Sequence, residues 1–438
     1  MIEKSPLIQE DDLAKALLKS PSGKLASLID KINENYEYWD TVKYKKAPGY
    51  TSFDVWTYVK ASRLKMQIKV WDKYNIKFSL TPEMQKICHE FDLKCGMSWN
   101  PNTIIPADFK EQFMVSTIME EAISSSQMEG AVTTRQVAKE ILRKEMQPKD
   151  VSQQMIVNNY HAIQFITENK DAPLSANLIL QLHRIMTENT LNNSPGVGAF
   201  RNNDNVVVEN GITHEIIHVP PSYTEIPDFI KELCTFFNDK ETDRFIHPVI
   251  RAIIIHYMLA YIHPFVDGNG RTARALFYWY MIKQNYWLTE YLSISRIISR
   301  SKKSYEKAYQ YSEIDGMDIG YFVTYHLKVI EQAYKELLLY IEKKQNEKRA
   351  ANTFLLLGDI NERQAQVIQM FTENPQCVIT VKDLQVKFMI TPTTAKNDII
   401  GLLDRGLLRE ISFNKVKKGY IKGDMFDDVV KAVLNGKN

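Results

Sequence analysis

The stretch HPFVDGNGRTAR, residues 263–274, decides the fold and the chemistry of this chain. An apolar run over Val249–Tyr261 precedes it, a second run starts at Ala273, and both predict buried helices. The stretch therefore predicts a tight loop between two helices, ending at a helix N-terminus. Free backbone N–H groups and the helix dipole favour an anion there. A base, a carboxylate and two arginines in one such loop indicate nucleotide phosphate chemistry.

The spacing inside this loop strengthens that interpretation. Gly268 and Gly270 allow positive φ and let the backbone approach a phosphate closely. Arg271 and Arg274 are three residues apart, so a helix places them on one face. The alternative is an ordinary Gly-x-Gly turn beside a core histidine. That alternative requires the aspartate and both arginines to occur at this spacing by chance.

The stretch resembles the signature of the Fic family, H-x-F-x-[D/E]-G-N-G-R-x-x-R, and meets every specified position. The resemblance implies a mainly α fold, with a Fic-type helical core and a β-hairpin flap. It also implies transfer of AMP from ATP to a Ser, Thr or Tyr hydroxyl of a target protein or of the chain itself. By position, His263 would be the general base and Asp267 the Mg²⁺ ligand.

The same resemblance implies a nucleotide-binding set around the loop. Arg274 would bind the γ-phosphate through its planar guanidinium, and Tyr305 would lie near the adenosine, although a tyrosine on a helix is as often a core residue. The full set is Gly268, Asn269, Gly270, Arg271, Thr272, Ala273, Arg274 and Tyr305.

A second motif, Ser125-Ser126-Gln127-Met128-Glu129-Gly130, resembles the family's inhibitory helix, [S/T]-x-x-x-E-[G/N], which we place at about 118–130. In relatives the glutamate pairs with the second motif arginine, here Arg274, and competes with the γ-phosphate for its donors. Some relatives also use it to orient a water that removes AMP. Alone, the pattern would indicate a helix with a Gly C-cap.

Residues of about 204–220 predict a hairpin, because Asn210-Gly211 lies between β-branched runs. The resemblance implies a flap whose edge, Val206, Val207 and Val208, pairs with an extended target segment. The alternative is an ordinary surface hairpin.

Other functions compete with AMP transfer. The Doc branch of the family, which transfers a terminal phosphate, carries Ala-Asn-Lys where this chain has Gly268-Asn269-Gly270, so the loop favours nucleotidyl transfer. The enzyme could chiefly remove AMP or transfer another phosphate-containing group. A rival of another class is a DNA-binding regulator with a nucleotide-sensing core, and the intact base at 263 argues against it.

Composition sets few limits. The chain has 55 basic and 53 acidic residues, so it carries no global signal for binding a polyanion. An N-terminal secretory signal and a membrane-spanning stretch are not evident, and Cys88, Cys95, Cys234 and Cys377 lack metal-binding spacing. We expect a cytoplasmic protein without membrane contact. The sequence leaves open whether the chain forms a homo-oligomer. His183, His247 and His256 are expected to pack rather than bind a ligand.

The pattern predicts four regions: a helical extension over 1–110, the core over 111–345, a linker over 346–360 and a second domain over 361–438. Ser52–Trp71 is expected to form packed helical segments, and Ser293–Tyr311 a helix. In the last region, three helices and a hairpin resemble a winged helix-turn-helix. Between residues 396 and 422 there are seven Lys or Arg and three acidic residues. That excess suits DNA phosphates, while protein contact is the alternative.

Overall fold

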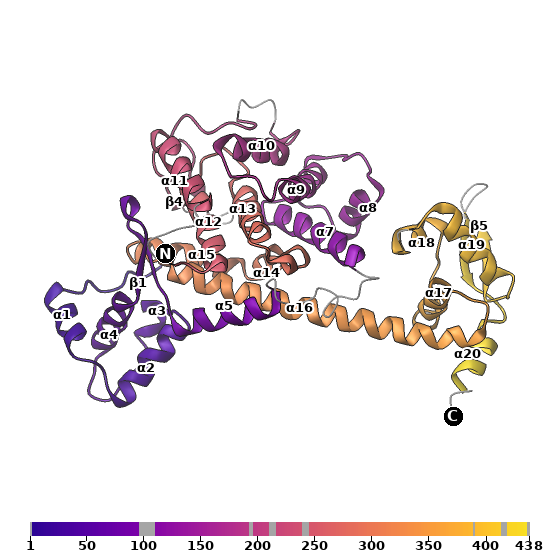
Figure 1. Cartoon of the computed structure of the whole chain (residues 1–438), viewed down its shortest axis with the longest axis horizontal. Helices are drawn as coiled ribbons and strands as arrows, with labels where there is room; N and C mark the ends of the chain where they lie inside the picture. The colour runs from indigo at the N-terminus through magenta and orange to yellow at the C-terminus, as the bar shows by residue number, and fades with distance from the viewer. Residues whose placement is uncertain are drawn as a thin grey trace. The chain divides into compact units, whose positions relative to one another are not determined.

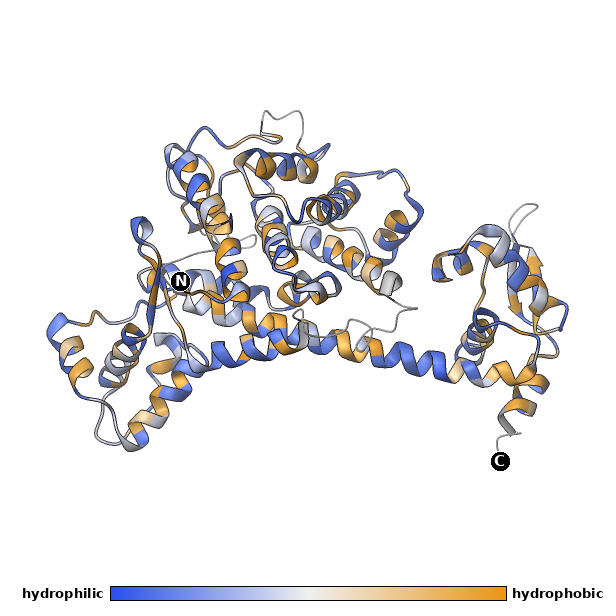
Figure 2. Ribbon diagram, in the orientation of Figure 1, coloured by the Kyte–Doolittle hydropathy of each residue, from blue (hydrophilic) through white to orange (hydrophobic). Residues whose placement is uncertain are grey.

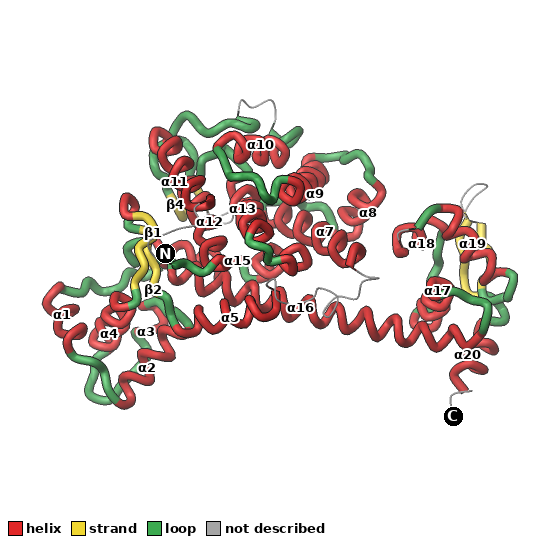
Figure 3. The backbone as a smooth tube through the Cα atoms, in the orientation of Figure 1, coloured by secondary structure: helices red, strands yellow, loops and turns green. Residues whose placement is uncertain are grey.

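The computed structural model describes residues 2–95, 110–191, 196–209, 216–238, 245–388, 390–412 and 418–435. The chain divides into two compact units, Met1–Tyr334 and Lys335–Asn438. Both units are mainly helical, as the sequence predicts, and the strands form short two-stranded pairs (Figures 1 and 3).

The N-terminal part of the first unit begins with four helices. They are α1 (Glu10–Leu18), α2 (Gly23–Glu34), α3 (Trp39–Val42) and α4 (Ser52–Lys65). Thr51 and Asp54 form a capping box that fixes the start of α4. The helical prediction for Ser52–Trp71 is correct for α4 and wrong after it. Gln67–Trp71 forms strand β1, which pairs antiparallel with β2 (Ile76–Ser79).

The strand replaces a helix there because tertiary packing outweighs local pattern. Asn75, with a φ of 53°, adopts the left-handed conformation that closes the turn after the short helix η1 (Asp72–Tyr74). The Trp71 ring packs against Phe229, with ring centroids 4.1 Å apart. The helix α5 (Pro82–Cys95) follows β2.

The N-terminal part is joined to the segment after the signature loop by buried polar contacts. Tyr36 donates a hydrogen bond to Asp318 at 2.6 Å, and Arg63 donates one to the Tyr321 hydroxyl at 2.7 Å. A Cβ atom on Gly320 would lie 2.0 Å from the Tyr36 ring, so only glycine fits beneath that ring. The extension is therefore an integral part of the first unit.

Two helices form the centre of the first unit, α12 (Pro248–Ile262) and α13 (Asn269–Lys283). Every residue of Val249–Leu259 is buried, and so is every residue of Arg271–Ile282. A helix that is buried on all sides requires neighbours on all sides. Figure 2 shows α12 as mainly hydrophobic, whereas α13 also carries polar residues such as Arg271 and Arg274. The helix α13 begins at Asn269, four residues before the apolar run that starts at Ala273, so the signature loop is shorter than predicted.

Other helices of the first unit enclose this pair (Figure 1). Ser175 and Asp150 cap their helices by accepting bonds from backbone N–H groups. The predicted helix over Ser293–Tyr311 is divided at Ser301 into two. The helical elements of this part of the chain are α7 (Lys110–Met128), α8 (Arg135–Lys144), α9 (Val151–Glu168), α10 (Ala176–Thr187), η3 (Tyr223–Glu225), α11 (Ile226–Asn238), η4 (Trp287–Tyr291), α14 (Ile294–Arg300), α15 (Lys302–Ile314) and the start of α16 (Gly320–Asn352).

A short antiparallel pair lies where the flap is predicted. It joins β3 (Val208–Glu209) to β4 (Ile216–His218), with Val208 opposite His218. Val206 and Val207 precede the strand, and the predicted Asn210-Gly211 turn lies outside the described residues.

The second unit follows the predicted order of three helices and a hairpin. The helix α16 continues to Asn352, so the first part of the predicted linker over 346–360 is helical. Phe371, Ile399, Leu402 and Phe426 are among the buried core residues. The elements after α16 are η5 (Thr353–Leu357), α17 (Glu362–Glu373), α18 (Val381–Phe388), α19 (Pro392–Leu403), β5 (Leu408–Ser412), β6 (Lys418–Lys422) and α20 (Phe426–Asn435). The last helix was not predicted.

Among the described residues, every helix is too short or too polar to cross a bilayer.

Candidate functional site

His263 is positioned by the end of α12. It adopts a left-handed conformation with φ 48° and ψ 59°, and its backbone N–H still bonds to the Leu259 carbonyl at 3.0 Å. The Nδ1 atom lies 3.2 Å from the Ala260 carbonyl, which can only accept, so Nδ1 carries the proton and Nε2 keeps its lone pair. Burial lowers the pKa of His263 to about 4. The imidazole is therefore neutral near pH 7 and can act as a base.

Asn269 fastens the loop that follows. Its side-chain oxygen accepts a bond from the Phe265 N–H at 2.9 Å, and its amide donates to the Phe265 carbonyl at 2.8 Å. The residue is 3% exposed. The resemblance assigns Asn269 to an anion nest, and the structure shows its side chain used to close the loop.

His183, on α10, supports the loop from beneath. Its Nδ1 accepts a bond from the Gly198 N–H at 3.1 Å, so its Nε2 is the atom that donates to the Asp267 carbonyl at 2.8 Å. The ring stacks on Phe265 with centroids 3.7 Å apart. Burial lowers the pKa of His183 to about 4, so it stays neutral. The expectation that His183 packs agrees with these contacts.

Arg201 ties the loop to the segment that leads into the flap. Its Nε donates to the His263 carbonyl at 3.0 Å, and its backbone N–H donates to the Pro264 carbonyl at 2.8 Å. Its guanidinium also reaches Asp204 at 2.8 Å. Because the Arg201 side chain is 1% exposed, its bonds to the two loop carbonyls form away from water and fix the turn at 263–264.

Asp267 and Arg271 form an ion pair at the rim of the loop. The Arg271 Nη2 atom lies 3.1 Å from one Asp267 oxygen, and the Gly268 N–H donates to the other at 2.6 Å. Arg271 is fully buried, whereas the Asp267 side chain is 48% exposed. Solvent can thus reach the carboxylate while the arginine holds it in place.

Arg274 and Glu129 meet across the loop. The Arg274 Nη2 atom donates to Glu129 Oε1 at 2.9 Å and to the Ser125 carbonyl at 3.0 Å, and Nε donates to the Ser125 hydroxyl at 2.9 Å. Burial acts to raise the pKa of Glu129, but the charge and hydrogen bond of Arg274, together with the charges of Arg271 and His263, outweigh it, and the pKa is lowered. Glu129 is therefore ionised, and it occupies one edge of the guanidinium.

Gly270 lies directly beside this ion pair. A Cβ atom at position 270 would lie 2.2 Å from Glu129 Oε1 and 3.1 Å from the Arg274 Nη1 atom. The absence of a side chain at 270 thus allows the carboxylate to lie directly over the start of α13.

A cavity of about 240 Å³ adjoins these groups. His263, Gly270, Arg274 and Glu129 line it, and so does Val208 of the predicted docking edge. Tyr305 also lines it, and its hydroxyl lies 3.1 Å from Nε2 of His256. Thr272 and Ala273 are buried in the core, where the Thr272 hydroxyl bonds to the Gly268 carbonyl at 2.9 Å.

Strand β4 is anchored through His218. Its Nε2 lies 2.7 Å from the Tyr261 carbonyl of α12, and its Nδ1 lies 2.6 Å from the Glu313 carboxylate of α15. These two contacts hold β4 against the rim of the cavity.

The second unit carries the surface predicted to meet DNA or protein. Asp398, on α19, is 3% exposed and pairs with Arg363 at 2.7 Å, so its charge does not face solvent. Four basic side chains lie beside acids: Arg405 with Asp359, Arg409 with Asp424, Lys418 with Glu410 and Lys422 with Asp427. Asp359, Asp424 and Asp427 fall outside the segment whose charges suggested DNA.

Sequence reasoning missed three features of the site: the structural roles of Arg201, His218 and Asn269. The roles of Arg201 and His218 are not evident from the sequence, because each bonds to a backbone carbonyl distant in the sequence. Such partners leave no residue pattern to read.

Known proteins resemble this chain mainly around the loop. Residues 173–281 match the Fic/DOC family model. The chain is 45% identical over 62 residues, 14% of each chain, to the protein adenylyltransferase Fic of Nematostella vectensis. It is 35% identical over 113 residues to the protein adenylyltransferase fic-1 of Caenorhabditis elegans, which covers 26% of this chain and 20% of that one.

A solved structure shares the fold over a longer span. A Fic family protein from Desulfovibrio desulfuricans G20 aligns with a TM-score of 0.52 at 15% identity, over 79% of this chain and 98% of that one. The matches to curated relatives span only about a seventh to a fifth of those proteins' length.

Proposed function

We propose that this chain, which carries a Fic domain of the Fic/DOC family at residues 173–281, transfers AMP from ATP to a hydroxyl side chain of a protein and is restrained by Glu129. The observation that carries the proposal is the single cavity shared by His263, Arg274 and Glu129. The cavity brings together a neutral imidazole, a guanidinium suited to a phosphate and a carboxylate suited to compete for it.

The transfer step uses the base as follows. The Nε2 atom of His263 takes the proton of the target hydroxyl, and the hydroxyl oxygen attacks the α-phosphorus of ATP. The new oxygen–phosphorus bond forms as the bond to the β-phosphate breaks, and pyrophosphate leaves. Positioning and charge neutralisation supply most of the rate, as in phosphoryl transfer generally.

The residues fit a Mg²⁺ ion that arrives with the nucleotide. Mg²⁺ is commonly held by one or two carboxylates together with substrate phosphates and waters, and Asp267 offers a carboxylate that is 48% exposed. The ion would neutralise phosphate charge. The buried Arg271 would keep Asp267 in place through their ion pair.

Inhibition follows from competition for one guanidinium. A γ-phosphate needs the Arg274 edge that Glu129 occupies, and Glu129 also fills the space over Gly270. A hydrogen bond between charged groups contributes about 1.5–3 kcal/mol. Removing the carboxylate should therefore raise the rate of AMP transfer roughly 10- to 100-fold.

The test compares the wild type, Glu129→Gly and Glu129→Gly/His263→Ala. Each is incubated with ATP and Mg²⁺, alone and with a cell extract as a source of targets, and covalent AMP is measured by intact mass or a labelled nucleotide. We expect Glu129→Gly to be labelled roughly 10- to 100-fold faster than the wild type, and the double variant not to be labelled. Labelling that persists without His263, in folded protein that binds ATP, would exclude the assigned base.

For the second unit we propose contact with protein rather than with DNA. Four of the seven basic side chains that suggested DNA lie beside acids. Ile400, Leu356 and Met425 are at least 42% exposed, which suits a protein surface better than phosphate.

A further inference from the structure

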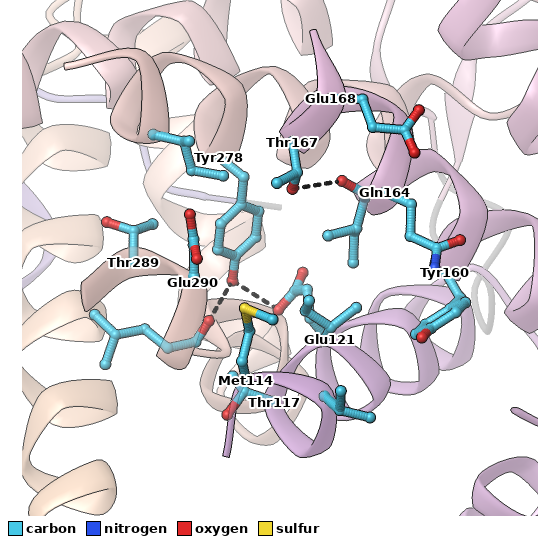
Figure 4. Close-up of a pocket in the computed structure, with 15 residues that line it drawn as sticks. Met114, Thr117, Glu121, Tyr160, Gln164, Thr167, Glu168, Tyr278, Thr289 and Glu290 are labelled. Carbon is cyan, nitrogen blue, oxygen red and sulfur yellow. Dashed lines mark hydrogen bonds between the residues drawn. The ribbon is translucent and has the colours of Figure 1, made fainter. Parts of the chain in front are cut away.

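A second cavity, of about 250 Å³, lies in the first unit away from the signature loop. It is formed by α7, α9, α13 and η4 and is drawn in Figure 4. The residues that α7 contributes, Met114 to Glu121, precede Glu129 by about two to four helical turns. The cavity therefore adjoins the helix that leads to the inhibitory carboxylate.

The lining is apolar with acidic groups. Apolar side chains come from α7, α9, α13 and the residue that follows η4: Met114, Val115, Ile118, Ile163, Ile282 and Leu292. Three carboxylates, Glu121, Glu168 and Glu290, also line it, whereas Lys and Arg are missing from the described lining residues. This combination favours a ligand with an apolar body and a positive charge.

Glu121 connects the cavity to the rest of the core. Its Oε2 atom accepts bonds from Tyr278 at 2.8 Å, from the Ser293 hydroxyl at 2.9 Å and from the Ser295 N–H at 3.0 Å. Its other oxygen accepts the Ser295 hydroxyl. Because both oxygens are used, Glu121 fixes α7 against α13 and α14 and does not offer a free site for a cation.

Glu290 is the carboxylate best placed to meet a ligand. In Figure 4 it lies beside the Tyr278 ring, while Glu168 points away from the centre of the view. Among the described residues Glu290 has no ion-pair partner, and burial raises its pKa. The adjacent Thr289 is 2% exposed, and its hydroxyl lacks a hydrogen-bond partner in the described part of the chain. Glu290 is thus a partly desolvated acid without an ion pair among the described residues, and the more distant charge of Lys170 only partly offsets the effect of burial on its pKa.

We propose that this cavity binds a small organic cation, a primary amine on an aromatic or branched apolar body, with Glu290 as its counter-charge. The volume suits a compact ligand, since an apolar cavity of roughly 150 Å³ accommodates benzene. We further propose that the bound amine reinforces inhibition. This second part rests on the proposed function of Glu129.

The direction of the effect follows from linkage. The cavity is formed in the conformation in which Glu129 pairs with Arg274. A ligand that binds this conformation better than one with α7 displaced shifts the population toward it. By reciprocity, a nucleotide whose γ-phosphate displaces Glu129 must weaken amine binding by the same factor.

Calorimetry on the full chain tests the site. The probes are 2-phenylethylamine, its neutral analogue 2-phenylethanol and the anion phenylacetate. We expect the amine to bind with a Kd of about 0.1–1 mM, in keeping with fragment-sized ligands, and the anion not to bind. Glu290→Gln should weaken amine binding at least about tenfold, while the matched control Glu168→Gln should change it less than about twofold. Equal binding of amine and alcohol, or an unchanged Kd in Glu290→Gln, would overturn the site.

A second titration tests the coupling. Amine binding is measured with ADP and with the β,γ-methylene analogue of ATP, both with Mg²⁺. In the wild type, the ATP analogue should raise the amine Kd at least about threefold and ADP should not. In Glu129→Gly neither nucleotide should change it. Equal Kd values in every wild-type titration, with the analogue shown to bind, would overturn the regulatory role.

The outcomes separate this inference from the proposed function. AMP transfer is read by covalent mass, whereas the amine site is read by heat of binding. A chain that transfers no AMP and still binds the amine through Glu290 would refute the proposed function and support the amine site.

Discussion

His263 illustrates how much of its chemistry a residue owes to burial. Its ordinary pKa lies near neutrality, and desolvation moves it to about 4. The neutral form then predominates through the whole physiological range. A lower pKa also makes a weaker base, so catalysis depends on how closely the target hydroxyl is held.

The first prediction concerns the pH profile of transfer by Glu129→Gly. The imidazole of the wild type protonates only as pH falls toward 4, and loss of the Glu129 charge lowers its pKa further. The part of kcat/KM that depends on this base should therefore stay level from pH 8 to pH 6. It should fall below about pH 5. Initial rates in buffers of constant ionic strength measure it, and a base titrating near 6.5 would contradict the structure.

The same shift has a consequence for stability. His263 and His183 both have a pKa of about 4 in the folded state and an ordinary value near 6.5 when unfolded. The unfolded chain therefore binds more protons, and the free energy of unfolding must fall as pH drops from 6.5 toward 4. Denaturant titrations of wild type and His183→Gln at pH 7 and pH 5 measure it, and the variant should lose less stability.

The second prediction concerns the fastening of the loop. Asn269→Ala leaves the buried N–H and carbonyl of Phe265 without their partner. It should lower the free energy of unfolding by roughly 1–3 kcal/mol per unsatisfied group and reduce transfer sharply. Asn269→Asp, which keeps an acceptor for the Phe265 N–H and loses the donor, is the matched control and should be intermediate. Full activity in Asn269→Ala would contradict the role.

The third prediction concerns the contact between Gly270 and Glu129. Gly270→Ala places a Cβ atom 2.2 Å from Glu129 Oε1, so it should destabilise the wild type by about 1–3 kcal/mol. In Glu129→Gly the obstacle is gone and the cost should largely disappear. A double-mutant cycle from denaturant unfolding measures this coupling, and additive effects would show that the two residues do not touch.

Sequence motifs predict contacts between motif residues, but they do not predict contacts with backbone groups. The meeting of Glu129 with Arg274 was expected from two short patterns, and the structure places them 2.9 Å apart. The roles of Arg201 and Asn269 could not be read, since their partners are backbone groups that any sequence would supply.

At the scale of elements, the sequence predicted that helices flank the loop, but it predicted less well where some helices begin and end. The apolar run over Val249–Tyr261 is helix α12 almost to the residue. The break at Ser301 between α14 and α15 has no glycine or proline to signal it. Strand β1 was missed because its packing against Phe229 is a tertiary effect.

The fourth prediction concerns β4. His218→Ala removes the bonds to the Tyr261 carbonyl and to Glu313, so the short β3–β4 pair should lose its anchor. If this pair docks targets, KM for the target should rise several-fold while the Kd for ATP stays within about twofold. Glu313→Gln keeps an acceptor and is the milder control. An equal rise in the KM for the target and in the Kd for ATP would indicate a general disturbance of the cavity.

At the scale of the whole molecule, the division into two units differs from the predicted linker. The boundary falls at 334/335, within a helix whose polar C-terminal half looked like a linker in sequence. Composition alone cannot distinguish a solvated helix from a solvated linker, because both are rich in charge.

The fifth prediction concerns DNA. With four basic side chains of the second unit beside acids, few counterions would be released on contact with a duplex. Fluorescence polarisation with a labelled duplex should give binding weaker than about 1 μM at physiological salt, near the non-specific range. A steep fall of affinity with added salt, abolished by Lys396→Ala and Arg409→Ala, would support the DNA-binding regulator instead.

The buried bond between Tyr36 and Asp318 joins residues 282 positions apart. During synthesis the N-terminal helices emerge long before the segment that completes their core. At about 5–20 residues per second, the ribosome needs roughly 15–60 s to deliver Asp318 after Tyr36. For that interval the apolar faces of the extension lack their native cover, so this protein should depend on chaperones while it is being made, and truncations before residue 320 should aggregate.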